Sequence, residues 1–245
     1  MEITEYKNIY ELEDEHWWYA GMRHIFITTI RSYIKNNEKI KILDVGCGTG
    51  YNIKIMRKFG EVYGIDYSKE AIKFCKLNKV KNVKIASAEK IPFKDNTFDL
   101  VTSFEVLYHK GIKDDNKALQ EIKRVCKKNG IIVIRLPAFN ILKRKHDNQV
   151  HGIRRYNKKA IIKMCKNLNI KIEKITYLNA LPFLPLVIIA SLERIFNPKV
   201  DSDIKKTNKL INNILKYYLL LEGKIINKIN LPFGTSILFI ARKMN

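Results

Sequence analysis

The sequence has 245 residues, 46% hydrophobic and 29% charged, which is typical of a folded globular protein and excludes a disordered or collagen-like chain. Its formal net charge of +22 at pH 7 would suit a polyanionic partner such as RNA, DNA or an acidic membrane. Because lysine far outnumbers arginine and the lysines are scattered, we interpret the charge as a compositional bias and expect no nucleic-acid partner.

Residues 8–36 carry apolar and aromatic side chains at helical spacing, which predicts one or two helices broken near Gly21. The cluster His16-Trp17-Trp18-Tyr19 lies in this segment, and its rings would either pack in a core or cover a ligand. From residue 39 onward, apolar strands alternate with amphipathic helices, an order that predicts a parallel, doubly wound sheet. The strands are predicted at 39–45, 61–65, 82–86, 98–104 and 131–136. The helices are predicted at 51–59, 68–77 and 114–128, the last capped by Asn129-Gly130.

After residue 137 the regular alternation ends. Residues 138–157 are rich in polar and titratable side chains, and a helix at 158–168 and a strand at 170–177 follow. Residues 179–232 are interpreted as an insertion of two or more helices, and a strand at 235–241 closes the chain.

A glycine-rich turn follows the first strand, in the stretch Ile42-Leu43-Asp44-Val45-Gly46-Cys47-Gly48-Thr49-Gly50. Glycine lets a backbone approach a nucleotide-like ligand closely, but this spacing differs from the Gly-x-Gly-x-x-Gly of dinucleotide folds. Asp66 ends the second strand, where a carboxylate can accept both ribose hydroxyls. The loop Ser87-Ala88-Glu89 and the pair Phe104-Glu105 follow the third and fourth strands, so they lie at the same carboxyl edge of the predicted sheet.

These motifs, in this order, resemble those of class I S-adenosylmethionine-dependent methyltransferases, and most of all the type 11 branch, which acts mainly on small molecules. The resemblance covers about residues 39–136 and includes the segments 91–93, 98–101 and 105–109. It implies an α/β, Rossmann-like doubly wound sheet of seven strands with an antiparallel last strand. It also implies S-adenosylmethionine as the cofactor.

The resemblance assigns roles in cofactor binding. The glycine turn and Asp44 would hold the methionine part, Asp66 the ribose, and Tyr67 would stack near the adenine. Ser87 stands where the family often has an aspartate, so its hydroxyl would replace a carboxylate. The whole implied cofactor site consists of Asp44, Gly46, Cys47, Gly48, Gly50, Asp66, Tyr67, Ser87, Ala88, Glu89, Phe104 and Glu105.

A narrower resemblance covers the flanks of this core. The tryptophan cluster with Arg23, and the segments 136–138, 146–147, 151–156 and 231–236, look like a methyltransferase subgroup often found beside glycosyltransferases and polyprenyl-linked sugar enzymes. Together the two resemblances predict one domain, residues 1–245. Its expected parts are a helical cap or lid (1–38), the cofactor-binding core (39–136), a lid segment with the sixth strand (137–178), a helical insertion (179–232) and the last strand (233–245).

Methyl transfer to oxygen or nitrogen requires alignment of the reactants and removal of a proton. Histidine suits that task near neutral pH, so we expect His151 or His109 to act as the base, with Asp147 orienting it. Tyr156 is a further catalytic candidate. Side chains expected to bind the acceptor are Trp17, Tyr19, Arg23, Tyr108, Asp147, Arg154 and Arg155. We expect no metal, although His146, Asp147 and His151 leave that alternative open.

The expected function is methyl transfer to an oxygen or nitrogen atom of a small-molecule or lipid- or glycan-linked acceptor. The alternatives are an RNA- or protein-modifying methyltransferase and a non-catalytic cofactor-binding protein. The insertion at 179–232 would line an acceptor pocket, pair with another protomer, lie on a membrane, or cover its own domain. The oligomeric state stays open.

The remaining sequence features predict a cytoplasmic protein. The four cysteines (Cys47, Cys75, Cys126 and Cys165) include no Cys-x-x-Cys pair, so neither a zinc site nor a disulfide framework is indicated. The N-terminus lacks the pattern of a signal peptide. The apolar run at 180–192 is too short to cross a bilayer and contains two prolines.

Overall fold

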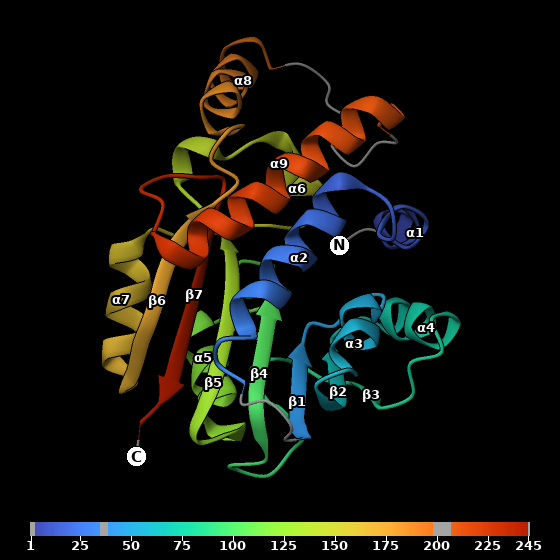
Figure 1. Ribbon diagram of the computed structural model, residues 1–245, viewed down its shortest axis with the longest axis vertical. Helices are drawn as coiled ribbons and strands as arrows, with labels where there is room; N and C mark the ends of the chain where they lie inside the picture. Colours follow the sequence, from blue (N-terminus) through green and yellow to red (C-terminus); the bar gives the residue numbers. More distant parts are fainter. Residues whose placement is uncertain (1–2, 35–38, 198–206, 245) are drawn as a thin grey trace.

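The computed structural model describes residues 3–34, 39–197 and 207–244, and it is built around one seven-stranded sheet (Figure 1). The strand order is β3-β2-β1-β4-β5-β7-β6. Strands β1 to β5 pair in parallel, whereas β7 is antiparallel to both of its neighbours, β5 and β6. The predicted fold class, including the antiparallel last strand, is therefore confirmed. The strands are β1 (Ile40–Val45), β2 (Gly60–Asp66), β3 (Val83–Ile85), β4 (Phe98–Phe104), β5 (Cys126–Pro137), β6 (Ile170–Leu178) and β7 (Ser236–Lys243).

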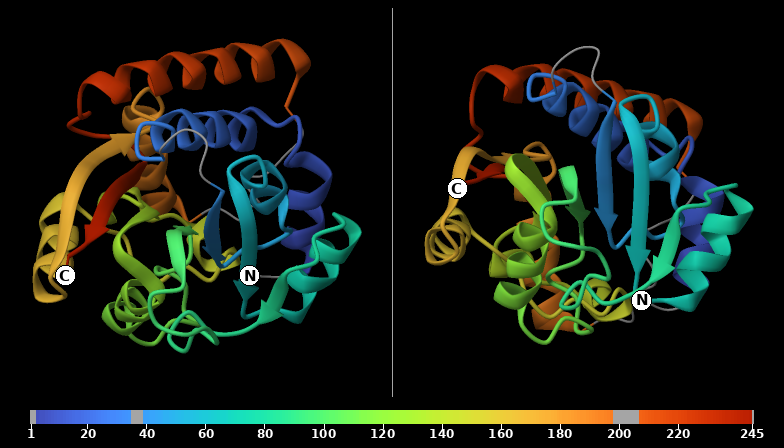
Figure 2. Two further views of the ribbon diagram at one scale, coloured as in Figure 1. Left: turned by 60° about the horizontal axis from the view of Figure 1, so that its bottom comes forward. Right: turned by 90° about the horizontal axis from the view of Figure 1, so that it is seen from below.

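Helices cover both faces of the sheet, which explains why the central strands are almost continuously apolar. In β1, Leu43 joins the core beneath α5 and α7, and its neighbour Ile42 joins the core beneath α2 and α3. Figure 2 shows α9 lying over α2 as a further layer on that second face. The helices are α1 (Ile3–Leu12), α2 (Trp17–Ile30), α3 (Tyr51–Met56), α4 (Lys69–Leu77), α5 (Asp115–Val125), α6 (Lys145–Gln149), α7 (Lys158–Asn167), α8 (Phe183–Phe196) and α9 (Lys209–Lys228), with a 3₁₀ turn, η1 (Asn140–Leu142).

Two sequence-based boundaries are wrong. The first two helices are separated at residues 13–16, and Gly21 lies buried inside α2. The prediction for Asn129-Gly130 also fails, because α5 ends at Val125 and β5 already begins at Cys126. Cys126 pairs with Phe98 of β4, so strand pairing ends the helix earlier than its amphipathic pattern suggests.

Gly21 is needed for the contact between α2 and α9. A Cβ built at this position would lie 2.6 Å from Cβ of Leu219, which is fully buried. We expect Gly21→Ala to lower the free energy of unfolding by about 1–3 kcal/mol, despite the better helix propensity of alanine, because the contact would be overpacked. Thermal or urea unfolding measures this change. In the double variant with Leu219→Ala, the two losses should be less than additive, and strict additivity would show that this contact is not the cause.

Candidate functional site

A cavity of about 1390 Å³ opens at the edge of the sheet toward which β1, β2 and β4 point. Its wall combines the turn after β1, the ends of β2 and β4, the segment 135–155, the N-terminal helices and the start of α8. Ligands in α/β folds bind at this edge because the loops after the parallel strands meet there. The motifs singled out in the sequence therefore converge on one space, as predicted.

The glycine turn presents its backbone to this cavity. Gly46, Gly48 and Gly50 have φ angles of +76°, +56° and +83°, which favour glycine. The amides of Gly46 and Cys47 donate to the carbonyl of Ile65, at 2.8 and 2.9 Å, and so tie the turn to β2. A Cβ added to Gly48 would meet nothing within 4 Å, so open space lies directly against this backbone. A ligand can therefore approach the turn without a side chain in the way.

Asp66 connects the turn to the second loop. One carboxylate oxygen accepts from the amide of Gly48 and the other from the amide of Ser68, each at 2.9 Å. Burial raises the pKa of this carboxyl, and the two amide bonds oppose that rise. Each oxygen keeps a second lone pair, so the cavity-lining carboxylate can still accept a pair of vicinal hydroxyls.

The adenine end of the expected site is open to solvent. Tyr67 lines the cavity but is 74% exposed, so it lies at the rim. Ser87 and Ala88 also line the cavity, and the Ser87 hydroxyl accepts from the amide of Glu89 at 3.1 Å. This position fits the predicted contact with an adenine ring.

Asp44 lies beneath the turn and does not line the cavity. One of its oxygens accepts from the Thr102 hydroxyl at 2.7 Å, and the other has no hydrogen-bond partner in the described part of the chain. Burial raises the pKa of Asp44 to about 7, and the nearby Asp66 carboxylate adds to the rise. We predicted that Asp44 holds the ligand directly. The structure corrects this prediction, because the Asp44 side chain lies under the glycine turn and supports it from below.

Four other predicted site residues do not line the cavity either. Gly50 precedes α3, and a Cβ there would press on Cys75 and Val80. The remaining three side chains hold the loops around α5. The carboxylate of Glu89 accepts from the amides of residues 113 and 114, Arg154 donates to the carbonyls of residues 112 and 113, and the Tyr156 hydroxyl donates to Asp115 at 2.7 Å. Glu89, Arg154 and Tyr156 thus lie outside the cavity lining, and the structure places their side chains in the loops around α5 and not at the expected ligand contacts.

His109 and His151 both line the cavity, with ring centroids 5.6 Å apart. The amide of Gly111 donates to Nδ1 of His109 at 3.1 Å, so the neutral ring carries its proton on Nε2. Burial lowers the pKa of His109 to about 4, and the neighbouring His151 and Lys110 contribute. His109 is therefore a neutral hydrogen-bond donor at pH 7, which leaves His151 as the better candidate base.

The predicted metal alternative gains no support. Within residues 3–34, 39–197 and 207–244, no three His, Cys, Asp or Glu side chains are arranged to hold a metal ion. Asp147 has another partner instead. Its carboxylate accepts two bonds of 3.0 Å from Arg155 and one of 2.7 Å from the amide of Arg144. The observed role of Asp147 is thus to position Arg155, a cavity-lining arginine.

A second ion pair, which the sequence did not reveal, lies at the ends of the neighbouring strands β4 and β5. Glu105 has a φ of +57° directly after β4, and its carboxylate pairs with Arg135 of β5 at 3.0 Å. Burial raises the pKa of Glu105, and Arg135 opposes the rise. The Arg135 guanidinium also lies 5.9 Å from a Trp18 ring centroid and 5.5 Å from that of Phe104. The available sequence signal was Arg135, a single charged residue in the otherwise apolar run 131–136.

The N-terminal helices form a wall of the cavity through contacts that sequence reasoning missed. Glu13 is buried, and its carboxylate accepts from the hydroxyl of Thr49 at 2.5 Å and from the side-chain Nδ2 of Asn78 at 3.3 Å. Burial raises the pKa of Glu13 to about 7. Arg23 donates to the carbonyls of residues 13 and 14 and lies 4.2 Å from the Tyr51 ring centroid. Of the expected acceptor-binding residues, these line the cavity: Trp17, Tyr19, Arg23, Tyr108, Asp147 and Arg155.

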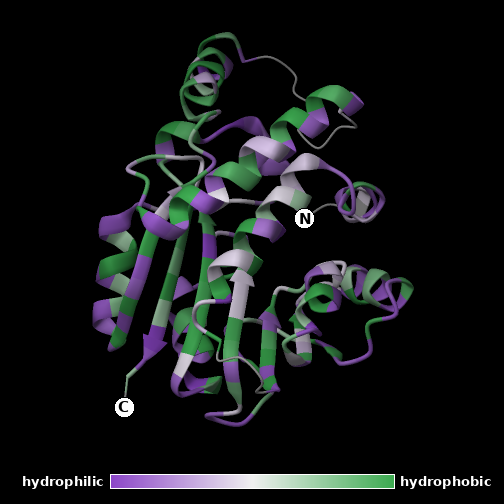
Figure 3. Ribbon diagram, viewed as in Figure 1, coloured by the Kyte–Doolittle hydropathy of each residue, from purple (hydrophilic) through white to green (hydrophobic). Residues whose placement is uncertain are grey.

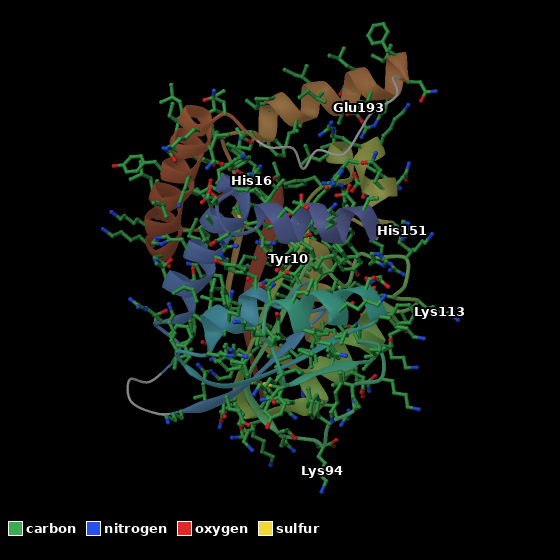
Figure 4. All side chains as sticks on the ribbon, turned by 90° about the vertical axis from the view of Figure 1, so that its right-hand side faces the viewer. Tyr10, His16, Lys94, Lys113, His151 and Glu193 are labelled. Atoms are coloured by element: carbon green, nitrogen blue, oxygen red, sulfur yellow. The ribbon has the colours of Figure 1, made fainter. Side chains whose placement is uncertain are left out.

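The far end of the cavity is apolar and belongs to the insertion. Pro182, Pro185, Leu186 and Ile189, in or next to α8, line it. Figure 4 shows α8 above the labelled His151. The cavity therefore has a polar end at the glycine turn, a central group of histidines and arginines, and an apolar end at α8.

Comparison with known proteins agrees with this geometry. Residues 43–134 match a family model described as "Methyltransferase domain". The chain is 31% identical to the uncharacterized protein MJ0638 of Methanocaldococcus jannaschii over 78% of its own length and 79% of the relative. It is 37% identical to the ubiquinone biosynthesis O-methyltransferase of Pelagibacter ubique, over 43% of this chain and 45% of the relative.

The solved structures show the same fold. A SAM-dependent methyltransferase from Archaeoglobus fulgidus aligns with 90% of this chain and 94% of its own, at a TM-score of 0.57 and 19% identity. Apart from MJ0638, the matches span only 27% to 60% of the length of the compared curated relatives. The family-model match, residues 43–134, includes the glycine turn and reaches into β5.

Proposed function

This chain belongs to the class I S-adenosylmethionine-dependent methyltransferases, and from that premise we propose that it methylates an oxygen or nitrogen atom of a small-molecule or lipid- or glycan-linked acceptor. One observation carries the proposal: a single cavity joins the glycine turn and Asp66 to histidines, arginines and an apolar end. S-adenosylmethionine is the cofactor, and when bound it supplies a methyl group on a sulfonium.

The residues around the turn fit this cofactor. The open space against Gly48 admits a ligand to the backbone, and the Asp66 carboxylate would accept from the ribose hydroxyls. Ser87 and Ala88 would meet the adenine ring at the solvent-exposed end. Asp44, below the turn, supplies a buried oxygen without a partner and so adds a negative potential under the methionine end.

The acceptor would bind in the remaining part of the cavity. Arg135, Arg144 and Arg155 line it and would attract an anionic or carbonyl-bearing group. Ion pairs to Glu105, Glu193 and Asp147, respectively, orient the three guanidinium groups. Trp17, Trp18 and the apolar residues of α8 line the same space and would exclude water from it when the acceptor is bound. His151 would take the proton from the acceptor atom, and the Nε2–H of His109 would donate a hydrogen bond.

We expect His151→Gln to lower kcat by roughly 10²- to 10⁴-fold, because the proton acceptor is lost. His109→Gln keeps an N–H donor and should lose less than about tenfold. Both variants should bind S-adenosylhomocysteine like the parent protein, since neither residue is assigned to the cofactor. The measurement is transfer of a tritiated methyl group from S-adenosylmethionine to phenols, carboxylates, amines and polyprenyl-linked glycans, with calorimetry for binding.

The same assay tests the assignment of His151 as the base and the assignment of the protein as an enzyme. Equal losses in the two variants would contradict the assignment of His151 as the base. Cofactor binding without transfer to any acceptor class would instead favour a non-catalytic cofactor-binding protein.

A further inference from the structure

Helix α8 is almost entirely apolar, yet only Ala190 and Glu193 of its 14 residues are buried. Figure 3 shows the hydrophobic colour along this helix at the end of the molecule. Leu184, Ile188 and Leu192 follow one another at four-residue spacing and are 65%, 60% and 46% exposed. Ile195 and Phe196 extend the exposed surface at 72% and 73%. A helix of a soluble protein normally turns such a stripe toward the core, so this exposed stripe indicates an external partner.

The polar side chains of α8 fix its orientation. Glu193 accepts from Nε of Arg144 at 2.7 Å and from the amide of Lys145 at 3.1 Å, and Figure 4 labels it on the side of α8 that faces the body. Arg194 donates to the carbonyl of Ile141 at 2.6 Å. The outward direction of the apolar stripe is therefore set by specific bonds.

Helix α9 adds a second exposed surface, which begins near α8 and extends down toward β6 and β7 (Figure 1). Its exposed apolar residues include Leu210, Ile214, Tyr217, Leu221 and Ile225. Lys209, Lys224 and Lys228 are exposed among them.

The acidic groups of α8 and α9 are withdrawn from this surface. Glu193 is buried against Arg144, and Glu222 is buried while it accepts from the amides of Asn179 and Ala180, the latter at 2.9 Å. Within the described residues of the two helices, every exposed charged side chain is therefore cationic. This charge complements an anionic surface.

We infer that α8 and α9 dock the protein on an anionic lipid bilayer. Exposed leucines and isoleucines flanked by lysines are the composition of a helix that lies in the interface, with its apolar side among the acyl chains. No helix in the described ranges has the length and hydropathy to cross a membrane, so contact is with one leaflet. Because Leu186 and Ile189 of α8 line the cavity, the helix that meets the bilayer also meets the acceptor space. The acceptor that this arrangement favours is one carried by a lipid, and that part of the inference rests on the proposed function. The docking of α8 and α9 on the bilayer does not.

The test is flotation of the full chain with vesicles of phosphatidylcholine alone or mixed equally with phosphatidylglycerol. We expect binding to the mixed vesicles that weakens with salt, and much weaker binding to phosphatidylcholine alone. The triple variant Leu184→Ser, Ile188→Ser, Leu192→Ser should lose about a hundredfold or more in partitioning. Lys224→Gln with Lys228→Gln should lose about fivefold per lysine, and only on the anionic vesicles.

Matched controls separate docking from folding and from catalysis. Leu77→Ser, Ile85→Ser, Ile162→Ser changes three exposed apolar residues elsewhere on the molecule and should leave flotation unchanged. All variants should retain S-adenosylhomocysteine binding and cooperative unfolding, so a failure of docking is distinct from a failure of the cofactor site. No flotation of the parent protein, or equal flotation of the α8 variant, would overturn the inference. A dimer that only the α8 variant abolishes, seen by light scattering without flotation, would instead make this face a protein interface.

Discussion

Replacement of Asp66 by alanine should weaken binding of S-adenosylhomocysteine by roughly 10²- to 10⁴-fold. Two charge-assisted hydrogen bonds to the ribose would be lost, each contributing about 1.5–3 kcal/mol. The same change leaves the amides of Gly48 and Ser68 without their acceptor, so the glycine turn and the start of α4 lose their connection. Isothermal titration calorimetry measures the loss directly.

Two further variants show where the effect of Asp66 comes from. Asp66→Asn keeps one acceptor oxygen and should lose less than the alanine variant. Asp95→Ala removes an exposed carboxylate paired with Arg124 away from the cavity and should bind like the parent protein. Unchanged affinity in Asp66→Ala, with the fold intact by circular dichroism, would refute the assignment of the cofactor site.

Asp44→Asn should stabilise the protein at pH 8 by up to roughly 4 kcal/mol. Burial raises the pKa of Asp44 to about 7 in the folded state, whereas an unfolded aspartate titrates near 4. Below pH 4 the carboxyl is protonated in both states and costs nothing. Between pH 4 and 7 the unfavourable ionisation of Asp44 in the core lowers the free energy of unfolding more and more. Above pH 7 this loss has reached its full size. The asparagine variant lacks it, while its side-chain oxygen can still accept from Thr102.

Urea unfolding of parent and variant between pH 4 and 8 measures this difference. The gap between the two curves should shrink as the pH falls and close near pH 4. Glu11→Gln, which alters an exposed carboxylate 3.8 Å from Lys7, should shift stability by less than about 0.5 kcal/mol at every pH. A gap that stays constant across the range would show that ionisation of Asp44 is not its source.

The sequence predicted the sheet well because its signals are local. The central strands are buried on both faces, so most of their residues are apolar, and glycine or a capping side chain marks where a strand or helix begins or ends. Ser68, for example, caps α4 as predicted, with its hydroxyl accepting from the amide of Ala71. The strand after α5 was placed too late because pairing of Cys126 with Phe98 is a long-range contact.

The gathering of the proposed cofactor-binding positions at one edge of the sheet was predictable for the same reason. Gly48, Asp66 and Ser87 follow consecutive strands, and a parallel sheet brings such positions to one edge. Asp44, Glu89, Arg154 and Tyr156 were placed in the wall of the cavity incorrectly, since a sequence shows that a polar residue is near a loop but not which partner its side chain takes. The side chains of Glu89 and Tyr156 form hydrogen bonds with residues 113–115, next to the start of α5, instead.

By itself the sequence determined the fold class and the positions of the glycine turn and of the Asp66 carboxylate at one edge of the sheet, because short-range patterns and the rules of parallel sheets are sufficient for these. Tertiary structure alone decided the rest. It brought Glu13 to Thr49, paired Arg135 with Glu105, turned Nδ1 of His109 toward Gly111, and left the apolar stripe of α8 facing outward. Each of these features depends on contacts between side chains that are far apart in the sequence. Such contacts are determined by how the whole chain packs, and a local sequence pattern does not specify them.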